Sequence, residues 1–397
     1  MGKLIVLMVT ALIDMIGLVM VIPLLPFYAE RFGATSAEIG LLIGAFSIAQ
    51  LVSAPLWGRF SDRRGRRPTL LLGLLISAVS YAVFAFANSF WLLIVSRVVQ
   101  GLGGGTVGVV QAYVTDLSAP QDRAKSLGWL SASTSLGAVL GPAAGSLLAQ
   151  VWGNAAPGLA AALLSLANMG FAWRYLRESH DGAGDDRPHH ARPALRGTLW
   201  EVVRHPWSPP ARLIWTYTVA IGAFYGMVAV FAQFLERRFG VNEDTIGYFF
   251  MWFGVMGVLT RLVLIGPAVK WMGELPLSRC GLVLLGAGMI LFPLSHSYVT
   301  LGISMVLMPL GTAFTFPGVT AALSRVVPTA DRGLYMGVQQ TFGGLARAVF
   351  PWWDGMAFES IGMASPFITA GVLCLLTIGL AVGLEREIGL PEETPKY

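Results

Sequence analysis

Long runs of apolar residues recur along the whole chain, separated by short polar stretches. The first, residues 4–26, reads LIVLMVTALIDMIGLVMVIPLLP and contains a single carboxylate, Asp14, near its middle. A helix of about 20 apolar residues can cross the ~30 Å hydrocarbon core of a membrane. The pattern predicts twelve such helices, at residues 4–28, 39–57, 69–87, 90–114, 126–150, 157–176, 213–235, 245–265, 277–294, 299–323, 334–353 and 365–384. The predicted fold class is therefore an all-α integral membrane protein.

Composition and charge support this prediction and orient the chain. Hydrophobic residues make up 55% of the 397 positions, charged residues 12%, and the mean hydropathy is +0.66, which excludes an ordinary soluble protein. Of the 27 Lys and Arg residues, 22 lie at the termini or in even-numbered connections, and three (Arg31, Arg237 and Arg238) lie in odd-numbered ones. Basic residues accumulate on the cytoplasmic side, so we expect both termini there, in the inner membrane. This topology explains the net charge of +5 without a nucleic-acid partner.

Three sequence blocks occur twice in the same order. Residues 31–40, 58–68 and 122–142 match 238–247, 266–276 and 331–351 at offsets of 207, 208 and 209. The repeat predicts two six-helix halves, at 1–176 and 213–397, with a substrate site between them, as in secondary transporters. Residues 177–212 are the predicted cytoplasmic linker. Its polar, Gly/Pro-containing first part favours flexibility, so we expect no metal site at His180, His189 and His190, and we expect no cofactor.

Three motifs carry a resemblance to a known family. GRFSDRRGRRP at 58–68, RVVQG at 97–101 and GAVLGPAAG at 137–145 resemble signatures of the major facilitator superfamily. The third resembles the signature of drug/proton antiporters, and residues 14–26 resemble the first helix of the twelve-helix branch that contains the tetracycline exporters. The resemblance implies two pseudo-symmetric halves that alternate access to a substrate and are coupled to protons. The expected partners are a small molecule, protons and lipid, with the chain acting as a monomer.

The loop at 58–68 contains one acid among five arginines. Gly58 and Gly65 permit a tight turn, and Arg63 and Arg66 are among the cytoplasmic anchors. The resemblance implies that Asp62 is a conformational latch, because in this family the equivalent aspartate closes a charge cluster against the other half, with help from a helix dipole. The alternative is local charge balance in a solvated loop.

In the segment 137–145, Gly137, Gly141 and Gly145 fall on one flank of a helix, four residues apart. Such a flank allows close backbone approach to another membrane helix, and Pro142 adds a bend. The alternatives are generic helix packing and, from the resemblance, a specific role in antiport.

Asp14 and Arg97 are ionisable residues predicted at similar depth in the membrane, given a rise of about 1.5 Å per residue. An intramembrane ionisable group is a functional hypothesis by default. We therefore predict that the two are partners, with Gln50 and Gln100 nearby, and that Asp14 carries protons. The alternative is a static ion pair.

The C-terminal half is rich in aromatic residues and methionine, which are suited to an adaptable apolar cavity. The predicted substrate cavity comprises Gln50, Gln100, Tyr217, Tyr225, Phe250, Phe316, Gln339 and Gln340. The leading functional hypothesis is a proton-coupled exporter of small lipophilic or amphipathic compounds. Alternatives on the same fold are export of a sugar or other metabolite and lipid flipping. A membrane enzyme is disfavoured, because the sequence offers no convergent cluster of His, Asp or Glu outside the linker.

Overall fold

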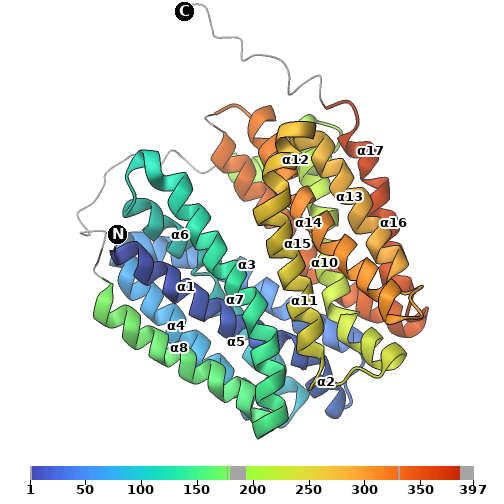
Figure 1. The fold of residues 1–397 in the computed structure, drawn as a ribbon. Helices are drawn as coiled ribbons and strands as arrows, with labels where there is room; N and C mark the ends of the chain where they lie inside the picture. Colours follow the sequence, from blue (N-terminus) through green and yellow to red (C-terminus); the bar gives the residue numbers. More distant parts are fainter. Residues whose placement is uncertain (1, 177, 179–193, 330, 385–397) are drawn as a thin grey trace, which may run out of the picture. The chain divides into compact units, whose positions relative to one another are not determined.

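The computed structural model describes residues 2–176, 178, 194–329 and 331–384, and all regular elements within them are helices (Figure 1). The N-terminal half contains six crossings: α1 (Gly2–Val21) continued by η1 (Ile22–Leu24) and α2 (Leu25–Arg31); α3 (Ser36–Arg64); α4 (Arg66–Ala85); α5 (Phe90–Gly104) with α6 (Val107–Asp116); α7 (Arg123–Trp152), preceded by η2 (Pro120–Asp122); and α8 (Ala155–Tyr175).

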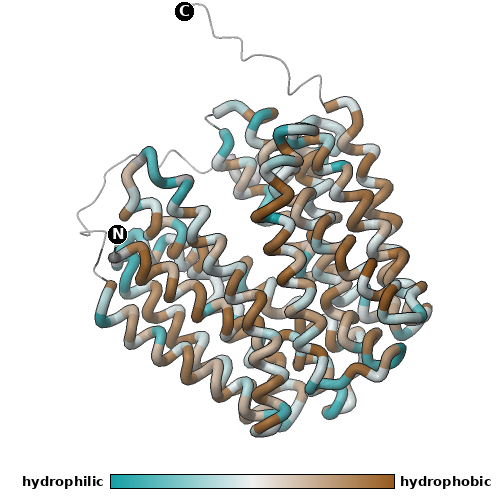
Figure 2. Tube along the Cα trace, in the orientation of Figure 1, coloured by the Kyte–Doolittle hydropathy of each residue, from teal (hydrophilic) through white to brown (hydrophobic). Residues whose placement is uncertain are grey.

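The C-terminal half repeats this order after one additional helix. It comprises α9 (Ala194–Arg204); α10 (Pro209–Phe239); α11 (Ile246–Leu259), the π-helical η3 (Thr260–Leu264) and α12 (Ile265–Met272); α13 (Glu274–Leu291); α14 (Tyr298–Val326); α15 (Arg332–Ser360); and α16 (Ser365–Leu376) with α17 (Ile378–Ala381). The predicted twelve-helix all-α membrane fold is confirmed. Within the part of the chain that the structure describes, ten helices are long and apolar enough to cross a membrane by length and composition, and Ser365–Ala381 is a shorter apolar helix. Figure 2 shows hydrophobic residues along these helices.

The predicted cytoplasmic linker, 177–212, contains a helix beyond the segment expected to be flexible. Helix α9 occupies residues 194–204, and α10 already begins at Pro209. Val202 of α9 is buried, and its carbonyl accepts a hydrogen bond from the Trp215 indole at 3.4 Å. The second half of the linker is therefore ordered by packing against α10. His180, His189 and His190 lie outside the described residues.

The chain divides into two compact units. Unit 1 contains residues 1–186, 228–258 and 348–363, and unit 2 contains residues 187–227, 259–347 and 364–397. Unit 1 thus combines the N-terminal half with the later part of α10, most of α11 and the last part of α15. The unit boundary in the eighth crossing falls beside η3, a π-helical segment of a type frequently found at functional sites.

Within unit 1, α7 lies against α1 (Figure 1), and glycines of α7 lie at the contact. A Cβ atom at Gly137 would lie 2.7 Å from the Leu12 carbonyl oxygen, and one at Gly141 would lie 2.8 Å from that of Ile16. One at Gly145 would meet the Met20 carbonyl. The three glycines therefore provide close backbone approach to α1. Their role in antiport stays a prediction.

The distal end of unit 1, where α2 finishes and α3 begins, contains a second glycine-lined crossing. A Cβ atom at Gly44 would lie 2.6 Å from the Ala348 carbonyl oxygen of α15. One at Gly40 would meet the backbone of Pro351, and one at Gly355 of α15 would meet the carbonyl of Ser36. We call this contact the α3–α15 seam. It joins the last part of α15 to the N-terminal half without intervening side chains.

Candidate functional site

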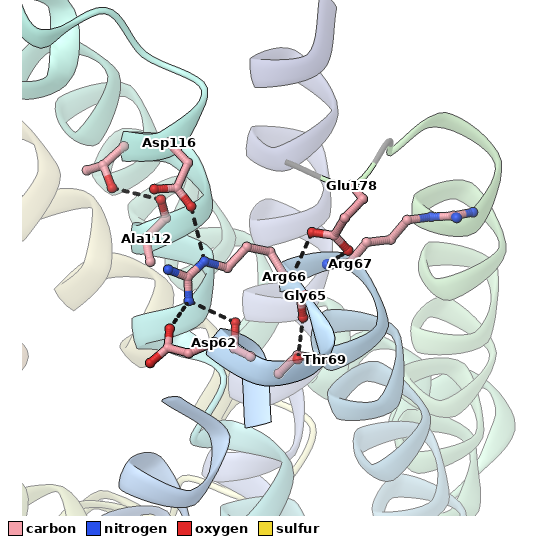
Figure 3. A network of polar contacts seen from close by, with 10 residues as sticks. Asp62, Gly65, Arg66, Arg67, Thr69, Ala112, Asp116 and Glu178 are labelled. Carbon is pink, nitrogen blue, oxygen red and sulfur yellow. Dashed lines mark hydrogen bonds and ion pairs between the residues drawn. The ribbon is translucent and has the colours of Figure 1, made fainter. Parts of the chain in front are cut away.

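The loop at 58–68 is reduced in the structure to one non-helical residue. Helix α3 ends at Arg64 and α4 begins at Arg66, while Gly65 between them has φ +100°, a conformation that side chains other than glycine rarely adopt. The N–H groups of Arg66 and Arg67 donate to the two carboxylate oxygens of Glu178, at 2.8 and 3.1 Å (Figure 3). A carboxylate stabilises a helix N-terminus by hydrogen bonding and by its charge. Glu178, which follows α8, thus holds the start of α4, and the sequence analysis missed it.

The guanidinium of Arg66 lies between two carboxylates (Figure 3). It donates to Asp62 at 2.8 Å, to Asp116 at the end of α6 at 3.1 Å, and to the Ser61 hydroxyl at 2.9 Å. The Arg66 side chain is only 14% exposed, whereas Asp62 is 52% exposed. Asp62 is therefore bonded within its own loop and still accessible. This geometry accommodates both local charge balance and a latch, so the latch stays a prediction.

The other two residues predicted for the latch are less constrained. A Cβ atom at Gly58 would meet nothing within 4 Å, and Arg63 is exposed. Of the residues predicted for the latch, Asp62, Gly65 and Arg66 are therefore the ones with specific contacts.

Asp14 lines a pocket inside unit 1. The pocket has a volume of about 340 Å³ and is lined by residues of α1, α4, α6 and α7 together with Thr106. Its polar lining consists of Asp14, Thr10, Thr106, Gln111, Ser131 and Thr134, and aliphatic residues and Met15 form the rest. Among these lining residues Asp14 is the only ionisable one. No ion pair within 4.0 Å joins Asp14 to any residue that the structure describes.

Arg97 makes contacts other than the one expected. It is 2% exposed, it donates to the side-chain oxygen of Gln100, and its guanidinium lies 4.7 Å from the centre of the Phe46 ring. Tyr81 of α4 is also buried and interacts electrostatically with both Asp14 and Arg97. The direct ion pair between Asp14 and Arg97 is therefore not formed in this structure. Arg97 instead makes a cation–π contact with Phe46 and donates to Gln100, while its Nε atom is buried without a partner among the described residues. Asp14 faces the pocket without a counterion among those residues.

The residues predicted for the substrate cavity fall into separate groups. In unit 2, the Tyr217 and Phe316 rings lie 5.6 Å apart and Gln340 donates to the Tyr217 hydroxyl at 3.4 Å. Gln339 is buried and accepts a hydrogen bond from Thr320 at 3.3 Å.

The remaining predicted residues have other neighbours. Also in unit 2, the central carbon of the Arg347 guanidinium lies 5.8 Å from the centre of the Tyr225 ring. In unit 1, Gln50 donates to the Gly104 carbonyl at 3.0 Å, and Phe250 packs on Phe231 at 5.0 Å. None of the predicted cavity residues is among those that line the Asp14 pocket. Their part in substrate binding stays a prediction.

Comparisons with known proteins give consistent matches over most of the chain. The family model described as Major Facilitator Superfamily matches residues 7–262 and 214–396. Multidrug resistance protein 1 of Bacillus subtilis (strain 168) is 28% identical over 398 residues, covering 98% of each chain. Tetracycline resistance protein, class C, of Escherichia coli is 31% identical over 300 residues, covering 73% of each.

A solved structure also resembles the chain over nearly its whole length. The crystal structure of the human organic anion transporter MFSD10 (TETRAN) has 25% sequence identity and a TM-score of 0.70, and the match covers 96% of this chain and 99% of that one.

Proposed function

This chain belongs to the major facilitator superfamily, and we propose that it is a proton-coupled exporter of small amphipathic compounds, cationic or neutral. It is a multi-pass membrane transporter by family. The observation that carries the proposal is the position of Asp14, the one ionisable residue lining a largely apolar pocket.

The proposed coupling follows from the cost of charge at that depth. A charged side chain near the centre of a membrane costs ~2.5–3.5 kcal/mol on insertion scales. Asp14 has no counterion among the described residues, so its charge is removed by a proton or balanced by a bound cation. Proton and cationic substrate therefore compete for the same carboxylate. Competition of this kind exchanges one for the other as the transporter alternates between the two sides.

The pocket lining supports the proposed substrate class. Aliphatic residues and a methionine form most of it, with hydroxyl and amide groups from Thr10, Thr106 and Gln111. An apolar pocket with a few polar groups suits an organic ligand with a polar tip better than a sugar, which needs many hydrogen bonds. The names of two relatives, a multidrug resistance protein and a tetracycline resistance protein, agree with this class.

The orientation is part of the proposal. We place the termini and the 58–68 loop on the cytoplasmic side of the inner membrane and the distal end of unit 1 outside, because basic residues gather in the even-numbered connections. Export then uses the inward proton gradient.

The test is uptake into proteoliposomes under an imposed pH gradient, with ethidium as the cationic probe. We expect the wild type to accumulate ethidium, and Asp14→Asn to bind it without gradient-driven accumulation. Asp244→Asn, which removes an acid outside the Asp14 pocket, is the matched control and should behave as wild type. Uphill transport by Asp14→Asn would refute Asp14 as the carrier. Transport of lactose, or flipping of a fluorescent lipid, in place of ethidium would favour the metabolite or flippase alternative.

A further inference from the structure

Asp354 is an acid buried in unit 1 that the proposed coupling does not use. It lies in the last part of α15, beside the α3–α15 seam, and is 1% exposed. Its Oδ2 atom has no hydrogen-bond partner among the described residues. A buried carboxylate without a donor or counterion is very costly, whereas a neutral carboxylic acid costs much less. The closed seam therefore favours Asp354 carrying a proton.

The surroundings of Asp354 have too few hydrogen-bond donors. The next residue, Gly355, packs against the Ser36 carbonyl. The side-chain nitrogen of Gln233 on α10 donates to the Ser36 hydroxyl at 3.1 Å and to Glu30 at 2.6 Å. The side-chain oxygen of Gln233 is buried and has no partner among the described residues. Two buried acceptor atoms without a partner among the described residues thus occur at this end of unit 1, one on Gln233, which donates to Ser36, and one on Asp354, whose neighbour Gly355 packs against Ser36. A proton on Asp354 adds a donor to this region.

The charged groups on the neighbouring elements are engaged elsewhere. Arg31 of α2 pairs with Glu243 at 2.5 Å. On α10, Arg237 lies 4.0 Å from Glu30 and 5.0 Å from the centre of the Phe358 ring. The other charged groups at this end of these helices are Glu38, which caps α3 with Thr35; Glu236, which faces Glu30; Asp244, which lines a pocket with Glu30 and Glu243; and Arg238 and Glu359, which are exposed. Earlier on α15, Arg347 lies over Tyr225. Within the described part of the chain, none forms an ion pair with Asp354.

We propose that Asp354 is a proton-binding site of the distal closure, which takes up a proton as the α3–α15 seam closes and returns it to the same side as the seam opens. This proposal rests on the proposed function in one respect, that an alternating transporter must open this seam. Opening brings water to Asp354, and hydration stabilises the carboxylate. Closing removes the water, so protonated Asp354 favours closure. The proton on Asp354 is not carried across the membrane, unlike the one proposed for Asp14. It makes closure of the distal end depend on the pH there.

The test measures the seam itself, in full-length protein in lipid nanodiscs. Spin labels are placed at Phe32→Cys, which is 39% exposed, and Ser360→Cys, also exposed, after Cys280→Ser and Cys374→Ser. Double electron–electron resonance then gives the populations of short and long distances between the two labels. It is measured at a series of pH values from about 5 to about 9, a range that includes the pKa values documented for buried carboxyl groups. We expect the short-distance population to fall as pH rises. Asp354→Asn, which resembles the neutral acid, should lose this response and stay closed.

Two further variants make the result specific. Glu359→Gln removes an exposed acid on the same helix and should keep the wild-type response. Asp354→Glu keeps a carboxyl and should retain a pH response with a shifted midpoint, which covers the case in which Asp354→Asn does not fold. A pH-independent wild type, or an Asp354→Asn variant that still responds, would overturn the proposal. The proposal would also be overturned if Asp14→Asn lost the pH response while the Asp354 variants kept it. A protein that fails to export ethidium but keeps an Asp354-dependent response refutes the proposed function and not this site.

Discussion

The connection between α3 and α4 and the connection between α12 and α13 have the same backbone and opposite charges. Each is a single glycine in the left-handed region, Gly65 at φ +100° and Gly273 at φ +81°. The first residue of the following helix then forms an ion pair with the end of a neighbouring helix. The pair is Arg66 with Asp116 at 3.1 Å in one copy and Glu274 with Arg325 at 2.9 Å in the other. These residues correspond at the repeat offsets of 208 and 209.

The two copies differ in the source of the acidic residue at the start of the second helix. Helix α4 begins with two arginines and no acid, and Glu178 supplies a carboxylate to its N-terminus from outside. Helix α13 contains its own acid in the first turn, Glu274, which suits the positive end of a helix dipole. The position of Asp62 is occupied by Lys270 in the second copy. Both copies therefore have an ion pair at this corner, with opposite polarity, and the exposed Asp62 is what the first copy adds.

The largest expected effect is on transport. If Asp62 is a latch, Asp62→Asn should reduce the initial rate of ethidium uptake by more than about tenfold with expression and ligand binding preserved. Lys270→Gln, at the same position in the other copy, should change it by less than about twofold. Transport at the wild-type rate in Asp62→Asn would reduce this residue to local charge balance and make the two copies equivalent.

The next effect is on stability and distinguishes the two glycines. Both Gly65→Ala and Gly273→Ala force a side chain into a strained backbone conformation, at about 1–3 kcal/mol each. The Cβ atom at residue 65 would also lie 2.6 Å from the Glu178 carboxyl carbon, whereas the one at residue 273 would meet nothing within 4 Å. Thermal unfolding in detergent should show the larger loss for Gly65→Ala. Equal losses of stability in the two variants would mean that the Glu178 side chain moves away from the added methyl group at no cost.

A charge reversal tests whether the first copy can accept the polarity of the second. Arg66→Glu gathers negative charge beside Asp62, Asp116 and Glu178, so it should destabilise the protein by about 1–2 kcal/mol. Adding Asp116→Arg should recover about 1 kcal/mol, measured as the interaction energy of a double-mutant cycle. Strict additivity of the two changes would show that the Arg66–Asp116 pair contributes no coupling.

The smallest effect is expected in the second copy. Arg325 is 59% exposed, and exposed ion pairs contribute about 0–1 kcal/mol. Glu274→Gln should therefore lower the unfolding free energy by less than about 1 kcal/mol, and the difference should shrink in high salt because exposed charges are screened. A larger loss that does not depend on salt would mean that the Glu274–Arg325 pair stabilises the protein as much as the less exposed Arg66–Asp116 pair.

The apolar runs predicted the twelve crossings, although several ends were set too short. Helix α3 was predicted at 39–57 and extends over 36–64, and α15 was predicted at 334–353 and extends over 332–360. Helices continue beyond the apolar core because polar and charged residues can occupy their ends, where hydropathy gives no signal. Helix α9 is not predicted for a related reason. It is ordered by a tertiary contact with Trp215, which amino-acid composition cannot reveal.

The site was predictable where a residue type was unusual for its position. Asp14 and Asp62 stand out as acids among apolar and basic residues, respectively. Asp116 and Glu178 do not, because an acid at a helix end is ordinary until the fold brings Arg66 against it. The expected pair of Asp14 and Arg97 came from depth alone. Depth does not specify which way a side chain points around its helix, and Arg97 points to Gln100 and Phe46.

The single-residue connection at Gly65 also has a consequence for how the protein enters the membrane. Because α3 and α4 share one residue between them, neither helix can be inserted while the other waits at a distance in solution. They must enter together, as a helical hairpin with its tip at residues 58–68. That tip contains five arginines, which resist passage through a hydrocarbon layer. On the proposed orientation, the hairpin therefore keeps its tip on the side where the ribosome synthesises the chain.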